Sequence, residues 1–189
     1  MITSAREDGY DVAADNLERF LDGTGGVKKL SVSWLRGFES VLDAEEKNRE
    51  RFEGSLSDIA DKMKDNSTRN FHDYWDRSLT ASQFGELYYA SGTSTITSHG
   101  NFKLVMNGEY VTITGIVKHR WWDPYNWHAG LAAYIPGFGS ISDEDALLLQ
   151  KHRGAAPFRM EAHWSQKLSA KIKIIDYWFN DENFQWKGP

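Results

Sequence analysis

The sequence predicts an α+β protein in which N-terminal helices, one of them long, precede a mainly antiparallel β-sheet with one short helix inserted. Two observations predict this class. Apolar residues recur every three or four positions early in the chain, as in amphipathic helices. From residue 93 onward, apolar or β-branched residues alternate with polar ones, as in half-buried antiparallel strands. We therefore expect a helical region over residues 1–90 and a β-rich region over residues 91–189, together forming one compact unit.

The helical region is expected to contain four elements. Residues 13–22 are predicted to be helical behind a cap at Asp11, and the glycines of residues 23–26 end this helix. A helix of about eight turns is predicted over residues 33–63, with the polar residues 45–51 facing solvent or a partner. Ser67 or Thr68 is expected to cap a short helix, and a further turn is expected over residues 82–89. The apolar residues of that short helix are Phe71, Tyr74 and Trp75.

The β-rich region is expected to form strands over residues 93–98, 102–106 and 110–119, with Asn107 and Gly108 as a hairpin turn. A loop over residues 130–139 follows, either a mobile lid or a wide turn. Ser142 and the three acidic residues after it predict the start of a helix that ends at Gly154. Residues 158–164 and 168–175 are expected to form a last strand pair. An aromatic tail is expected to cover the sheet: Tyr177, Trp178, Phe179 and Trp186.

Composition excludes several classes of function. The chain has no cysteine, so disulfides, thiolate zinc sites and cysteine nucleophiles are ruled out. The net charge is −5, and because neither half of the sequence is basic, no nucleic-acid partner is expected. No run approaches the roughly 20 apolar residues of a transmembrane segment, and residues 1–9 lack a signal-peptide core. We expect a soluble chain without its own signal peptide.

The chemistry of the protein is expected in residues 119–128, HRWWDPYNWH, which follow a predicted strand. Two imidazoles, a guanidinium, a carboxylate and a phenol cannot be buried cheaply without hydrogen bonds to one another. Asp123 is the leading catalytic candidate, because an aspartate before a proline is held in extended geometry and could accept a proton or bind a divalent cation. The alternative is an Asx-type turn, in which the carboxylate accepts backbone N–H groups.

The neighbours of Asp123 supply further candidates. Tyr125 could orient a substrate, and Arg120 could hold an anionic oxygen. His119 and His128 could act as acid, base or metal ligand. The alternatives are that the Tyr125 ring packs in the core, that Arg120 forms a surface ion pair, and that the two histidines are structural. The tryptophans of this segment could stack on a ligand, or they could pack in the core of the sheet. They are Trp121, Trp122 and Trp127.

The stretch Asp123-x-Tyr125-Asn126, preceded by a glycine-turn hairpin and with His and Arg close by, resembles the catalytic segment of colicin M-type bacteriocins. The resemblance covers about residues 91–130. Those toxins cleave the peptidoglycan precursor lipid II between its undecaprenyl chain and pyrophosphate, in a reaction that depends on a divalent cation. The resemblance implies catalytic roles for Asp123 and Tyr125, with Mg²⁺ or Ca²⁺ bound at Asp123.

The chain departs from that family at two places. Asn126 stands where the family has a second acidic residue, and the His119-Arg120 pair precedes the aspartate instead of following it. A wider resemblance is to the C-terminal toxin domains of interbacterial effectors. It implies delivery to the periplasm or envelope of a target bacterium and an immunity protein as a partner.

These features lead to one main functional hypothesis and three alternatives. The main hypothesis is an antibacterial effector that hydrolyses the pyrophosphate of a lipid-linked envelope substrate. Asp123 would act as metal ligand or base, and Arg120 would stabilise phosphate charge. Tyr125 and His128 would position groups or exchange protons. The alternatives are a membrane-active, pore-forming toxin whose tryptophans settle at the lipid interface, a protein-binding module, and a structural subunit.

Overall fold

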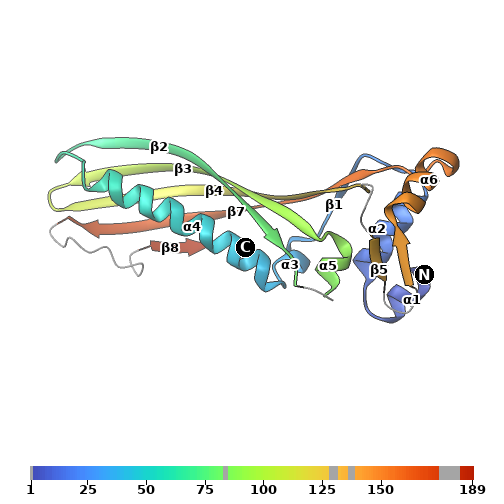
Figure 1. Ribbon diagram of the computed structural model, residues 1–189. Coiled ribbons are helices and arrows are strands. Elements are labelled where there is room, and N and C mark those ends of the chain that lie inside the picture. Colours follow the sequence, from blue (N-terminus) through green and yellow to red (C-terminus); the bar gives the residue numbers. More distant parts are fainter. Residues whose placement is uncertain (1, 83–84, 128–131, 136–138, 175–183) are drawn as a thin grey trace. The chain divides into compact units, whose positions relative to one another are not determined.

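The computed structural model describes residues 2–82, 85–127, 132–135, 139–174 and 184–189. The predicted α+β class is confirmed (Figure 1). Helices α1 (Ile2–Glu7), α2 (Asp11–Leu21), α3 (Val32–Leu35) and α4 (Glu39–Ala60) precede most of the sheet. The short helix α5 (Glu86–Ala90) lies between two strands, and α6 (Asp143–Arg153) comes later in the chain.

The main sheet has six strands in the order β1-β7-β4-β3-β2, with β8 pairing along β7. The strand β1 is parallel to β7, whereas β8 is antiparallel to it and places Lys187 opposite Lys167. Two further strands, β5 (Ala132–Ile135) and β6 (Gly139–Ser142), pair with each other. The strands of the main sheet are β1 (Val27–Lys29), β2 (Thr68–Thr80), β3 (Thr93–Asn107), β4 (Tyr110–Tyr125), β7 (Phe158–Lys173) and β8 (Phe184–Lys187).

The chain divides into two compact units. The first unit contains Met1–Val41, Ser78–Thr95 and Trp121–Ala162, and the second contains Leu42–Arg77, Ile96–Arg120 and His163–Pro189. The boundary between them falls within the long strands β2, β3, β4 and β7. Each unit is therefore assembled from three separate stretches of sequence.

Two helices of the first unit, α2 and α6, lie close to where the sequence predicts them. The helix α2 ends just before Gly23, whose φ of 67° suits glycine and whose missing side chain leaves room for the backbone of Gly154. The helix α6 begins after Ser142, whose hydroxyl accepts a hydrogen bond from the Asp145 backbone N–H at 3.1 Å. It ends at Gly154, which has a φ of 76°.

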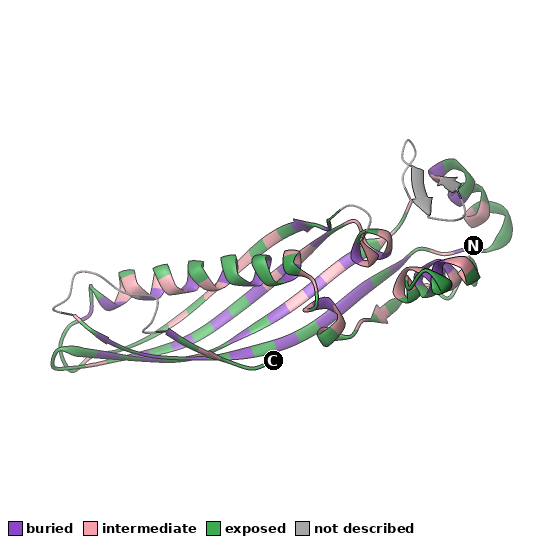
Figure 2. Ribbon diagram, turned by 90° about the horizontal axis from the view of Figure 1, so that it is seen from below, coloured by how far each residue is buried: buried purple, intermediate pink, exposed green. Residues whose placement is uncertain are grey.

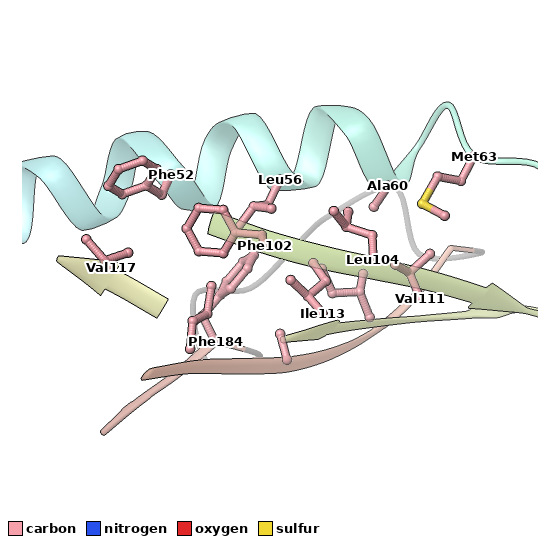
Figure 3. Close-up of a cluster of buried hydrophobic side chains, with 13 residues drawn as sticks. Phe52, Leu56, Ala60, Met63, Phe102, Leu104, Val111, Ile113, Val117 and Phe184 are labelled. Atoms are coloured by element: carbon pink, nitrogen blue, oxygen red, sulfur yellow. The ribbon is translucent and has the colours of Figure 1, made fainter. Parts of the chain in front are cut away.

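The second unit is a sheet covered on one face by α4 (Figures 1 and 2). The helix contributes Phe52, Leu56 and Ala60 to a core that also takes in residues of β3, β4, β7 and β8 (Figure 3). The Phe102 ring lies in this core, 5.3 Å from the Phe52 ring. A side chain at Gly100 or Gly115 would collide with the Phe102 ring, so these two glycines make room for it.

The hairpin predicted at Asn107 and Gly108 is confirmed. The strand β3 ends at Asn107, β4 begins at Tyr110, and Gly108 has a φ of 58°. The two predicted strands before the turn are one strand, β3, because the chain continues extended through Gly100. The last predicted pair is likewise one strand, β7. Its polar centre at Gln166 is buried and hydrogen-bonded, so it does not form a turn.

The short helix predicted after Ser67 is wrong, since residues 68–80 form the strand β2. Phe71 and Trp75 pack against the core of the second unit, whereas Tyr74 is 59% exposed on the other face. Spacings of three and four residues suggested a helix, but pairing with β3 selects the alternating pattern of a strand. The predicted helix over residues 33–63 is interrupted between α3 and α4, around Gly37, a poor helix former.

Two other predictions are tested only in part. Trp186 packs against the core of the second unit as expected, while Tyr177, Trp178 and Phe179 lie outside the described residues. Within the predicted loop over residues 130–139, the residues Ala132–Ile135 form β5. Residues 130, 131 and 136–138 lie outside the described residues. In the part of the chain that is described, none of the helices combines the length and apolar character needed to cross a membrane.

Candidate functional site

The predicted site segment does not follow a strand but largely belongs to one, because β4 extends to Tyr125. Alternation along the strand separates its side chains. His119, Trp121 and Asp123 are buried on one face, whereas Arg120 and Trp122 are on the opposite face and only partly buried. The unit boundary places His119 and Arg120 in the second unit and the residues from Trp121 onward in the first. His128 lies outside the described residues.

Both ring nitrogens of His119 are engaged inside the second unit. The Gln166 Oε1 atom accepts a hydrogen bond from His119 Nε2 at 3.0 Å, and the Ser98 hydroxyl lies 2.8 Å from His119 Nδ1. The imidazole also stacks on the Trp164 indole, with 5.3 Å between ring centroids. His119 is 1% exposed, so these contacts hold it in the core rather than at an open site.

His119 belongs to a buried polar cluster that connects α4 to the sheet, and the sequence did not reveal this cluster. The Trp164 indole N–H donates to Glu45 Oε2 at 3.0 Å, and the Asn48 amide donates to Ser98 Oγ at 2.9 Å. Glu45 and Asn48 lie in the polar stretch predicted to face solvent or a partner. They face the sheet instead, which satisfies polar groups that would otherwise be costly to bury.

The Ser98, His119 and Gln166 side chains form a chain of contacts that resembles a nucleophile, a base and an orienting group. Geometry alone does not make this a reactive site, because a substrate has to reach the nucleophile. Ser98 is 0% exposed and Gln166 is 2% exposed. The Asn48 amide also occupies the Ser98 hydroxyl. The arrangement therefore serves packing.

Asp123 and Tyr125 are neighbours on the same face of β4 in the first unit. Asp123 is 5% exposed, and burial raises the pKa of its carboxyl group from the ordinary value of 3.8 to about 8. Burial and the nearby Asp123 charge also raise the pKa of the Tyr125 phenol. At neutral pH the Asp123 carboxyl is thus mostly protonated, so it can donate a proton or a hydrogen bond but is a poor base.

Aromatic rings surround Tyr125. Its ring stacks on Phe158 at 4.8 Å, and the rings of Phe20 and Trp127 each lie 6.1 Å from it. In the same unit, four buried polar atoms have no hydrogen-bond partner among the residues that the structure describes: Arg19 Nε, Ser94 Oγ, Trp121 Nε1 and Trp127 Nε1.

The expected divalent cation at Asp123 stays a prediction. Within the described ranges, no group of three or more His, Asp or Glu side chains is arranged to hold a metal ion. The rings of Phe20 and Phe158 lie beside the neighbouring Tyr125, and aromatic rings supply none of the oxygen ligands that Ca²⁺ or Mg²⁺ takes.

The second unit carries a further candidate site, on the face of the sheet turned away from α4. We call this surface the open face; it consists of the outward side chains of β2, β3, β4, β7 and β8 within that unit. Buried and exposed residues alternate along the long strands (Figure 2). The large apolar side chains of the open face are exposed: Tyr74, Val105, Tyr110 and Ile116. Its lysines are Lys103, Lys118, Lys167, Lys171, Lys173 and Lys187. Among the described strand residues of this unit, Asp76 is the single carboxylate that points the same way.

A shallow groove of about 620 Å³ lies on this face. Five strands of the second unit contribute to its lining, which is mostly apolar between polar side chains. His72 and Asn101 form one end, where the amide oxygen accepts a hydrogen bond from His72 Nδ1 at 2.6 Å. The cationic side chains of the groove are Lys103, Lys167 and Lys187.

The structure is thus an α+β protein in which the sheet of the second unit has one face covered by a helix and one exposed face with a groove lined by lysines. No protein family, curated protein or solved structure matches the chain. The sequence predicted Asp123 and Tyr125 as neighbours, and the structure places them together. We did not predict the open face from the sequence. The lysines spaced at even intervals in residues 167–173 are nevertheless typical of an exposed, basic strand face.

Proposed function

We propose that the protein binds anionic lipid surfaces through the open face of its second unit. The observation that carries this proposal is the concentration of lysines among exposed aromatic and aliphatic side chains, in a chain whose net charge is −5. Surfaces that bind anionic membranes combine these two properties: lysines attract the headgroups, and apolar side chains enter the interface.

Charge complementarity favours an anionic partner over a neutral one. Each lysine near an anionic membrane surface contributes about 1 kcal/mol of attraction. The apolar side chains add a contribution that does not depend on salt, because Ile116 is 43% exposed and Tyr74 is 59% exposed. An acidic peptide would use the same lysines but would not need these side chains to be exposed together.

The test is flotation of the full chain with vesicles of phosphatidylcholine alone and of phosphatidylcholine mixed with phosphatidylglycerol. We expect at least about tenfold more binding to the anionic vesicles, decreasing as salt is raised. Lys118→Glu should weaken binding, whereas Lys62→Glu, at an exposed site beyond the end of α4, should weaken it less. Ile116→Ser should weaken binding and Leu148→Ser, on α6 of the first unit, should not. Equal binding to both kinds of vesicle, or none to either, would overturn the proposal.

A second candidate function is the envelope hydrolase that the sequence suggests, an antibacterial effector with lipid II as substrate and an immunity protein as partner. One observation favours it: a buried carboxyl with a pKa of about 8 lies beside Tyr125, in a unit that also buries unpartnered polar atoms. Perturbed carboxyl groups are common at catalytic sites. The protonated Asp123 would act here as a general acid rather than as a base.

The hydrolase is tested by release of pyrophosphate-linked muropeptide from lipid II, with and without Mg²⁺ or Ca²⁺. We expect activity in the wild type and a loss of at least about 100-fold in Asp123→Asn, which cannot donate the carboxylic proton. The same activity in both proteins, or none in either, would reject this candidate. Leakage of vesicle contents that survives Asp123→Asn would instead support a non-enzymatic membrane-active toxin.

A further inference from the structure

The groove on the open face contains a pair of like charges held side by side. Lys167 on β7 and Lys187 on β8 are directly opposite each other in the register of the two strands. Side chains in such positions start about 5 Å apart, and like charges there are destabilising. Lys103 on β3 is a third cation in the same groove.

These three lysines have no anionic partner in the described part of the chain. None of them forms an ion pair with Asp or Glu there. Other lysines on the same strand are partnered. Lys171 lies over the Tyr110 ring at 4.4 Å, and Lys173 lies 3.6 Å from the Glu109 carboxylate. Three of the lysines that lack an anionic partner on the open face therefore lie together in the groove.

The remaining lining of the groove suits a phosphate group next to an apolar body. The Thr114 and Ser169 hydroxyls and the Asn70 amide are hydrogen-bond donors that could reach phosphate oxygens. Ile116 supplies an exposed aliphatic surface between the strands that carry the lysines. Lysine is a flexible point charge, so three lysines select for charge rather than for one fixed geometry.

We propose that the groove binds the doubly charged phosphomonoester headgroup of a lipid, with Lys103, Lys167 and Lys187 around the phosphate. This inference rests on the proposed binding of anionic lipid surfaces and adds a preference among them. A phosphomonoester carries up to two negative charges near neutral pH, since its second pKa is about 6. A phosphodiester headgroup carries one. Three ammonium groups around one phosphate stabilise the dianion more than the monoanion.

The experiment compares vesicles that contain phosphatidic acid with vesicles that contain phosphatidylglycerol, matched for surface charge. We expect the wild type to bind phosphatidic acid vesicles at least about fivefold more tightly, a difference of about 1 kcal/mol. The double variant Lys167→Gln/Lys187→Gln should lose this preference while still binding both kinds of vesicle. The matched control Lys171→Gln/Lys173→Gln removes the same charge from the same face and should keep the preference.

Each outcome separates this inference from the proposed function. Equal binding of the wild type to the two anionic vesicles would overturn the phosphomonoester site and leave anionic lipid binding intact. Binding to neither would overturn both. Loss of the preference in the Lys171/Lys173 control would show a general charge effect and also overturn the site. Displacement by glycerol phosphate at a concentration equal to that of the accessible lipid would identify a free phosphate ester as the ligand and overturn the lipid assignment.

Discussion

The Asp123 carboxyl group is buried, and burial changes the chemistry that this residue can perform. A solvated aspartate is ionised at neutral pH and can accept protons or bind cations. At 5% exposure the pKa of Asp123 rises to about 8, so the neutral acid predominates at pH 7. The residue that the sequence suggested as a base or metal ligand thus has the protonation state of an acid.

Asp123 should make the protein less stable as pH rises. The folded pKa of about 8 lies above the ordinary value of 3.8, so between these values the folded state holds a proton that the unfolded state has released. The free energy of unfolding should fall by at most about 1.4 kcal/mol per pH unit in this range and level off above it. Asp123→Asn mimics the protonated acid and should remove this dependence.

The measurement is urea unfolding of both proteins at about pH 5 and pH 8. The wild type should lose stability relative to Asp123→Asn by roughly 2–4 kcal/mol between the two pH values. Other titrating groups cancel in this comparison because both proteins share them. Parallel pH profiles for the two proteins would contradict the burial of an uncompensated carboxyl.

Individual residues show where prediction from sequence succeeded and where it failed. The sequence placed Asp123 and Tyr125 in one segment, and strand alternation brings them to one face. The same alternation puts Arg120 on the opposite face from His119, which the composition of the segment could not reveal. The partners of His119 are Ser98 and Gln166, which are 21 and 47 residues away, so they depend on strand register.

The helix α4 shows why a polar stretch does not always mark a solvated helix face. Glu45 and Asn48 interrupt the apolar periodicity, but both are buried against the sheet. Their partners are on strands that come later in the chain, so no local pattern could have identified them. The strand β2 was misassigned for a similar reason, since its pairing with β3 selects between two patterns that the sequence allows.

Glu45→Ala should lower the free energy of unfolding by about 2–4 kcal/mol, because it leaves the Trp164 indole N–H without its buried acceptor. The matched control is Glu46→Ala, the next residue of the same helix. It removes an exposed ion pair with Arg49 and should change stability by less than about 1 kcal/mol. Urea unfolding measures both. Equal losses in the two variants would show that the buried carboxylate does not hold the helix to the sheet.

The two compact units do not correspond to two consecutive parts of the sequence. Each is built from three stretches of chain, and the core of the second unit combines α4 with strands as distant as β8. The change from helical to alternating patterns near residue 90 indicates the order of elements only in part, because the strands β1 and β2 come before it. It does not indicate the packing units, because the long strands run through the boundary between them.

A fragment of residues 91–189 should therefore fail to fold by itself. It lacks the α4 residues Phe52 and Leu56, which are 0% exposed in the whole chain, and it lacks the strand β2. The fragment should show no cooperative urea transition and no near-ultraviolet circular dichroism, whereas the full chain should show both. A cooperative transition in the fragment would mean that the sheet is stable without its helical cover.

The two indole-to-carboxylate bonds that fasten α4 to the strands have a consequence for how the chain is made. Trp164 donates to Glu45, and Trp186 donates to Glu53 at 2.6 Å, so the bonds span 119 and 133 residues. On a translating ribosome the helix emerges long before either tryptophan. The core around α4 is complete only when the residues of β7 and β8 have also left the exit tunnel, so we expect this unit to finish folding late in synthesis and to need chaperones until then.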